Sequence, residues 1–348
     1  MRPIDFGRRY IRLKGPVKLR IDMRSMIVTA ILLGATAAIA LFALMVGTLT
    51  LSVQDVFSAL IGQATGMTRT VVIEWRLPRV LAAIIFGGAL AVSGAIFQSL
   101  TRNPLGSPDI IGFSAGSYTG VLIVLLVSGS SSFISVATGA LVGGFTTAIL
   151  IYLLAFRKGT QGFRLIIVGI AISAILGSVN SMLLLQSKAE VALTAAAWGV
   201  GSLNGIDWKH VLPAILLVIF LLICAVMMNR PLRQIELGED AAKSHGVRIE
   251  RSQLLLIFVA VALTAVPTAV MGPVSFVALA APQIAQRFTK SVESLISAAA
   301  MGAFLLMGAD VLAQRIIPGM IFPVGVVTLS LGGVYLVWLL FQQARSRA

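Results

Sequence analysis

The sequence FRLIIVGIAISAILGSVNSMLLLQSK, residues 163–188, decides the fold class. Between Arg164 and Lys188 no side chain carries a formal charge, and most are apolar or small. A helix needs about 20 consecutive apolar residues to cross the hydrocarbon core of a bilayer. This segment therefore predicts a transmembrane helix.

The same pattern recurs along the chain. Further charge-free stretches cover residues 25–54, 80–101, 110–156, 210–229, 252–286, 294–309 and 316–344. Two of them are long enough for two helices each, divided at 128–132 and at Gly272-Pro273, which gives ten expected spans. The spans centre near residues 35, 90, 118, 146, 175, 219, 260, 281, 304 and 334.

The composition agrees with this fold class. Only 11% of the residues are charged, whereas ordinary globular domains carry about 25%. The sequence predicts an all-α membrane protein with about ten transmembrane helices. We expect a basic cytoplasmic N-terminal segment over residues 1–25 and one transmembrane domain over 26–344.

The basic residues indicate the orientation of the chain. An even number of spans places both ends on one side of the membrane. With both ends inside, the inner segments hold 21 of the 27 Lys and Arg residues. The positive-inside rule therefore favours this topology. The formal charge of +14 is then a topology signal, and no nucleic-acid partner is expected.

Signatures of catalysis and of cofactor binding are absent from the sequence. It contains no P-loop motif for ATP. The two histidines, His210 and His245, fall at opposite faces of the membrane in this topology, so they predict no metal site. Cys224 is the single cysteine and lies within a span, where a small packing residue is the simpler interpretation. No nucleophile–base pair indicates an intramembrane hydrolase.

Residues 230–251, RPLRQIELGEDAAKSHGVRIER, form the most charged segment after the N-terminus, and Gly238 and Gly246 punctuate it. Its apolar positions fit two short amphipathic helices; they are Leu232, Ile235, Leu237, Ala241, Ala242 and Val247. Two interpretations remain open: a solvated loop, or a docking element for a partner on the inner side.

Two arginines on the outer side oppose the general trend. Pro78 suits the first turn of a helix, so Arg79 would lie near a helix N-terminus, where a cation opposes the macrodipole. Arg76 and Arg79 are either functional or interfacial anchors. Asp310 is the one acid deep in an apolar span; it lies five residues before Arg315, and we expect a local ion pair or hydrogen bond near the helix end.

Five motifs occur in order along the chain: RLPR at 76–79, SGAIFQSLTRNPLGSPDIIG at 93–112, LGEDAAKSHGV at 237–247, GPVSFVALAAPQIAQR at 272–287 and PVGVVTLSLGG at 323–333. Together they resemble the iron-siderophore and vitamin B12 permease family, the membrane subunits of type II ATP-binding-cassette importers. The resemblance covers nearly the whole chain from about residue 30, and it is closest to the ferric enterobactin permeases. One departure is Gln283, where members of the family often have His.

The resemblance implies roles for specific residues. Arg76, Arg79 and Arg315 would dock a periplasmic binding protein, and Asn103, Leu105, Gly162 and Phe163 would belong to a cytoplasmic gate. The 231–247 loop would couple to an ATPase through Leu232, Leu237, Gly238, Ala241, Ala242 and Gly246. Spans two to five and seven to ten would form two inverted four-helix repeats.

The implied function is that of a non-catalytic permease subunit, which imports a ferric siderophore of the catecholate, enterobactin type across the bacterial inner membrane. Its partners would be a second, similar permease chain, two ATPase subunits that bind ATP and Mg, and the binding protein. The chain itself would bind no cofactor or metal.

Two alternatives remain. One is a permease of the same family for haem, a hydroxamate siderophore or vitamin B12. The other is an ion-coupled secondary transporter, which needs titratable residues within its spans. Asp310 is the one acid deep in a span, and a single titratable residue gives this alternative little support.

Overall fold

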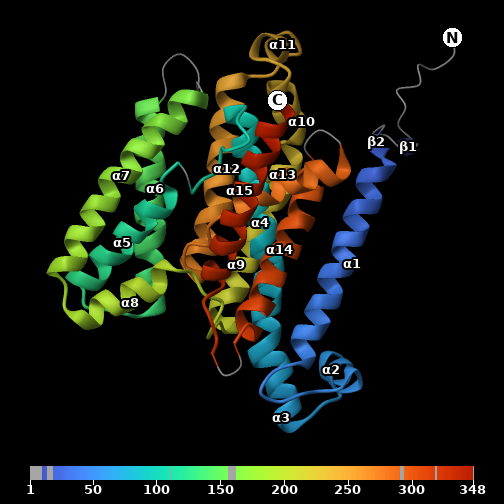
Figure 1. The fold of residues 1–348 in the computed structure, drawn as a ribbon, viewed down its shortest axis with the longest axis vertical. Coiled ribbons are helices and arrows are strands. Elements are labelled where there is room, and N and C mark those ends of the chain that lie inside the picture. The colour runs from blue at the N-terminus through green and yellow to red at the C-terminus, as the bar shows by residue number, and fades with distance from the viewer. Residues whose placement is uncertain are drawn as a thin grey trace.

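The structure is a computed structural model that describes residues 10–13, 19–109, 111–155, 162–290, 294–317 and 320–347. Its helices form an elongated bundle (Figure 1). The first residues of α1 and the last residues of α15 lie at the same end of this bundle, together with α10 (Asn229–Glu236) and α11 (Glu239–Ser244). We call this the inner end, and the opposite end, with α2 (Val53–Leu60) and α3 (Gly66–Arg69), the outer end.

Helices occupy all ten of the expected spans. They are α1 (Met23–Met45), α4 (Leu77–Thr101), α5 (Phe113–Val127), α6 (Phe133–Ala155), α7 (Gly162–Gln186), α9 (Trp208–Met227), α12 (Ile249–Met271), α13 (Val277–Thr289), α14 (Leu295–Arg315) and α15 (Val324–Arg347). Seven helical stretches of the described residues are long and apolar enough to cross a membrane. The expected fold class is confirmed.

Smaller elements connect or precede these helices. α8 (Ala189–Gly199) lies between α7 and α9. Ahead of α1, β1 (Tyr10–Leu13) and β2 (Leu19–Asp22) form an antiparallel pair in which Tyr10 is opposite Asp22. The all-helical expectation did not include this pair, because no sequence pattern in the basic N-terminal segment pointed to strands. Most of that segment, residues 1–9 and 14–18, lies outside the described residues.

α4 lies at the centre of the bundle. Of its most apolar stretch, 83% is buried inside the protein, against 11% for α7. Glycines allow this burial: a Cβ atom on Gly87 would overlap the backbone of Gly302 in α14, and one on Gly94 would overlap the carbonyl group of Ala278 in α13. Small residues of this kind let helix backbones approach closely in a membrane.

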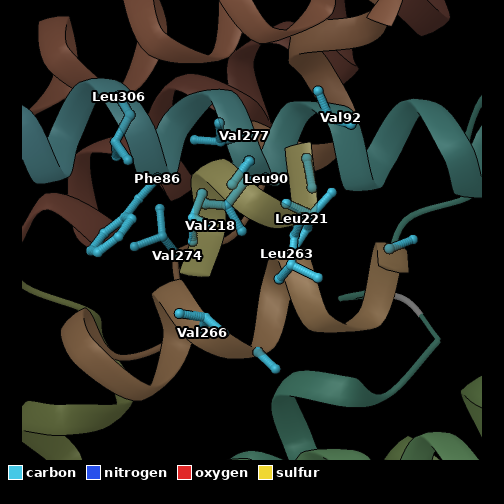
Figure 2. Close-up of a cluster of buried hydrophobic side chains, with 14 of the residues drawn as sticks. Phe86, Leu90, Val92, Val218, Leu221, Leu263, Val266, Val274, Val277 and Leu306 are labelled. Carbon is cyan, nitrogen blue, oxygen red and sulfur yellow. The ribbon is translucent and has the colours of Figure 1, made fainter. Parts of the chain in front are cut away.

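Aliphatic and aromatic side chains fill the remaining space around α4 (Figure 2). Phe86 and Leu90 of α4 are at most 1% exposed. They meet side chains from α9, α12, α13 and α14, among them Val218, Leu221, Leu263, Val266, Val277 and Leu306. The core is therefore built around one helix that contacts both halves of the chain.

The two halves of the chain share an unusual local plan. α4 ends at Thr101 and is followed by Arg102 (φ 49°), and α5 begins after Gly112 (φ 93°). α12 likewise ends at Met271 and is followed by Gly272 (φ 75°), and α13 begins after Phe276 (φ 71°). Each half thus has a long helix, an irregular segment and a short helix, and the long helices run in opposite directions. This arrangement agrees with the expected inverted repeats.

The start of the second span differs from expectation. Residues Thr70–Arg76 form a π-helical turn that joins α3 to α4, and the Leu77 amide bonds to the Val72 carbonyl five residues earlier. Pro78 has no amide hydrogen to continue the ordinary ladder, which fits a shifted register here. Arg79 therefore lies inside a continuous helical stretch and does not oppose a free helix N-terminus.

Candidate functional site

Arg79 forms a buried ion pair with Asp310, which joins α4 to α14. Arg79 Nε donates to the two carboxylate oxygens at 2.9 and 3.1 Å, and Nη2 donates to Oδ1 at 2.8 Å. The side chains are 16% and 1% exposed. Gln314 Nε2 also donates to Oδ2 at 2.8 Å. The carboxylate is thus well satisfied, as a buried charge requires.

This pair bears on two expectations. The ionic partner of Asp310 is Arg79 on another helix and not the neighbouring Arg315, whereas the expected local hydrogen bond is present and comes from Gln314. Arg79 itself is committed to a partner within the chain, so it is not a free cation for docking. Sequence spacing could not reveal the pair, because the two residues are 231 positions apart.

Arg76 also has partners within the chain. Its Nη1 and Nη2 atoms donate to the carbonyl groups of Leu44 and Leu49 at 2.7 and 2.6 Å. These bonds hold the end of α1 and the segment after it against the π-helical turn. Arg315 is exposed, and its charge lies near enough to repel that of Arg76. Arg315 is therefore the most available of the three expected docking residues.

The segment after α4, residues 102–112, is called the inner loop below. Asn103 Oδ1 accepts a hydrogen bond from the Leu105 amide at 2.9 Å, and the Asn103 carbonyl accepts one from the Gly106 amide at 2.9 Å. α4 ends at Thr101, just before Asn103, as Pro104 predicts. Leu105 is 45% exposed.

The start of α7, one of the expected gate segments, lies against the end of α4. A Cβ atom on Gly162 would lie 2.5 Å from the Thr101 Cα atom at the end of α4. The absence of a side chain at Gly162 thus lets α7 begin directly against the residue that precedes the inner loop. Phe163 is 75% exposed beside it.

The inner loop also contains an unusual carboxyl group. Asp109 Oδ1 accepts a hydrogen bond from Ser114 Oγ at 2.7 Å, whereas Oδ2 is buried with no partner among the described residues. Burial raises the pKa of Asp109 to about 6, and the bond from Ser114 opposes this rise.

The 230–251 segment folds into the two expected short helices, α10 and α11. Gly238 between them and Gly246 after them have φ values of 126° and 81°, which favour glycine. Leu237 is 78% exposed. Leu232 and Ala242, however, are 2% and 0% exposed, so they pack within this chain and do not face a partner.

Sequence analysis did not find two bonds that join α10 to the end of α4. Ser99 Oγ donates to Glu236 Oε1 at 2.6 Å, and Arg102 Nη2 donates to the Ile235 carbonyl at 3.1 Å. Partners 137 and 133 positions apart carry no local signal. These bonds place α10 in direct contact with the end of α4 and the start of the inner loop.

The ion pair between α4 and α14 generates a stability prediction. Asp310→Leu and Arg79→Leu should each lower the free energy of unfolding by about 3–5 kcal/mol, because each leaves a buried charge unpaired. The double variant should recover most of this loss, since it buries no charge. Arg315→Leu, at an exposed position, is the control and should change stability little. Denaturant titration in detergent measures all four, and a double variant no more stable than the single ones would contradict the assignment.

Known proteins resemble this chain over almost its whole length. Residues 31–342 match the FecCD transport family. The chain is 47% identical over 326 residues to the ferric enterobactin transport system permease protein FepG of Escherichia coli (strain K12), with 93% of this chain and 98% of that protein covered. It is 33% identical to the hemin transport system permease protein HmuU of Yersinia pestis, with 78% and 84% covered.

A solved structure shares the fold. It is described as an inward-facing conformation of a metal-chelate type ABC transporter, and it superposes with a TM-score of 0.80 at 25% identity, over 91% of this chain and 99% of that one. The order of the helices, the shared plan of the two halves and these matches agree: the chain belongs to the FecCD transport family.

Proposed function

We propose that this chain is the permease subunit of an ATP-driven importer that carries a ferric siderophore, of the catecholate type represented by enterobactin, across the inner membrane. The observation that carries the proposal is the inner end of the bundle. There, α10, the first of the two short helices, is bonded directly to the end of the central helix α4 and to the first residue of the inner loop. The cargo is inferred from the 47% identity to a ferric enterobactin permease.

The proposed assembly has four other components. A second, similar permease chain would complete the transport pathway. Two ATPase subunits would bind ATP and Mg and would contact α10 and α11, and a binding protein would deliver cargo at the outer end. This chain itself would bind no cofactor. Leu237 and Gly238 are the groups through which we expect an ATPase to contact this chain, because Leu232 and Ala242 are buried. Chemistry on ATP would take place entirely in the ATPase subunits.

The ion-coupled alternative has less support in the structure. A secondary transporter needs a titratable group within its spans that can gain and lose a proton or ion. Asp310 is the acid in question, and Arg79 and Gln314 hold both of its oxygens. Such a carboxylate is a structural partner and a poor relay.

Uptake into vesicles tests the proposed function. The complete importer, reconstituted in proteoliposomes with the binding protein outside, should accumulate ferric enterobactin when ATP is supplied to the ATPase side. A proton gradient without ATP should give no uptake. Haem and a ferric hydroxamate serve as competing cargoes and should be transported poorly. Uptake driven by the gradient alone would contradict the proposal.

The ATPase contact is tested at Gly238. Gly238→Arg should abolish uptake and substrate-stimulated ATP hydrolysis, because an L residue is strained at φ 126° and the added side chain would occupy the proposed contact. Gly129→Arg is the matched control: Gly129 also has positive φ and open space around it, but it lies in the outer loop between α5 and α6. Equal uptake by both variants would place the ATPase contact elsewhere.

Docking of the binding protein is tested at Arg315. Arg315→Glu should weaken binding-protein association by a factor of about 1.4 to 5 at low salt, since an exposed ion pair contributes about 0.2–1 kcal/mol. The effect should shrink as salt increases. Lys188→Glu makes the same charge change on the outer side next to α8 and should leave association unchanged. Equal affinities of the Arg315 variant and the unaltered protein across a salt series would exclude Arg315 from the interface.

A further inference from the structure

The inner half of α4 and the inner loop lie along α13 through a series of polar contacts. Gly94 packs on the Ala278 carbonyl, which lacks an ordinary helical donor because Pro282 has no amide hydrogen. One turn further along α4, Gln98 Nε2 donates to the Leu279 carbonyl at 3.0 Å. The last contact of this series is at the inner loop, where Gln283 Nε2 donates to the Pro104 carbonyl at 2.5 Å.

Gln283 has a second partner on its other side. Its Oε1 atom accepts a hydrogen bond from the Tyr335 hydroxyl of α15 at 3.4 Å, and the residue is only 7% exposed. A glutamine amide supplies a donor and an acceptor at the same time. Gln283 therefore bridges the inner loop to α15, a connection that neither a carboxylate nor an aliphatic side chain could make.

The opposite side of the inner loop is bonded to α10. Arg102, the first residue of the loop, donates to the Ile235 carbonyl, and Ser99 just before it donates to Glu236. The loop is thus held between α10 on one side and Gln283 on the other. Displacement of α10 would move the end of α4, and the bond to Pro104 would carry that movement to α13 and α15.

We propose that Gln283 is a positioning residue, which fixes the inner loop by bridging Pro104 to Tyr335 and so links the motion of α10 to α13 and α15. This inference rests on the proposed function, because it assumes that α10 is moved by an ATPase. Gln283 lies in the motif at 272–287, at the position where members of the family often have His, and the inference gives this position a role. An imidazole also offers one donor and one acceptor, so histidine should serve at this position.

The test uses the complete importer with a spin label on Leu105→Cys in a Cys224→Ala background. Gln283→Leu and Gln283→Glu remove the donor to Pro104, and Gln283→His restores a donor. Loss of one hydrogen bond should shift the population of released loop about fivefold. The Leu and Glu variants should therefore show a more mobile label and more ATP hydrolysed per substrate imported. The His variant should return both values toward those of the unaltered protein.

Tyr335→Phe is a milder variant that removes only a hydroxyl group and leaves the bond to Pro104 in place. It should raise label mobility less than Gln283→Leu does. The inference is overturned if the Leu and Glu variants match the unaltered protein in label mobility and in ATP per substrate. It is also overturned if the His variant is as impaired as the Leu variant. If the unaltered importer shows no ATP-dependent uptake at all, the proposed function fails instead, which keeps the two failures distinct.

Discussion

The close packing of α4 against α13 and α14 is the constraint on which the rest of the structure depends. Lipid tails are as apolar as leucine, so the hydrophobic effect gives helices in a membrane little reason to associate. Here the association comes from backbone contact at Gly87 and Gly94, and from the Arg79–Asp310 pair. A larger side chain at either glycine would separate the helices that bury α4.

Because α4 is held along its length, its two ends are mechanically connected. The outer end is tied to α14 by the ion pair, and the adjoining π-helical turn is tied to the segment after α1 by Arg76. The inner end is tied to α10 by Ser99 and Arg102. A displacement of α10 would therefore be transmitted to the inner loop through the bonds of Ser99 and Arg102. This arrangement suits the proposed function, in which motion of an ATPase subunit opens and closes the transport pathway.

The sequence predicted features that depend on neighbouring residues, and it did not predict contacts between residues far apart in the chain. Charge-free runs of helical length predicted the spans, and the pattern at 230–251 predicted two short helices, since apolar periodicity needs only neighbouring residues. The partner of Asp310 and the bonds to Glu236 and Gln283 depend on how distant helices pack, and no spacing encodes that. The pairing of Arg79, which was expected to be free for docking, escaped sequence analysis for the same reason. The N-terminal strand pair was not predicted, because the basic residues of its segment indicated only the orientation of the chain in the membrane.

Hydrogen exchange of the reconstituted importer, with and without ATP, tests the mechanical connection most directly. The account predicts that amides of α4 are among the slowest to exchange in both conditions, because the helix is buried and fully bonded. It also predicts that exchange in the inner loop and in α10 changes together when ATP is added. Exchange in α4 as fast as in the exposed α7, or a response of α10 to ATP that leaves the inner loop unchanged, would contradict it.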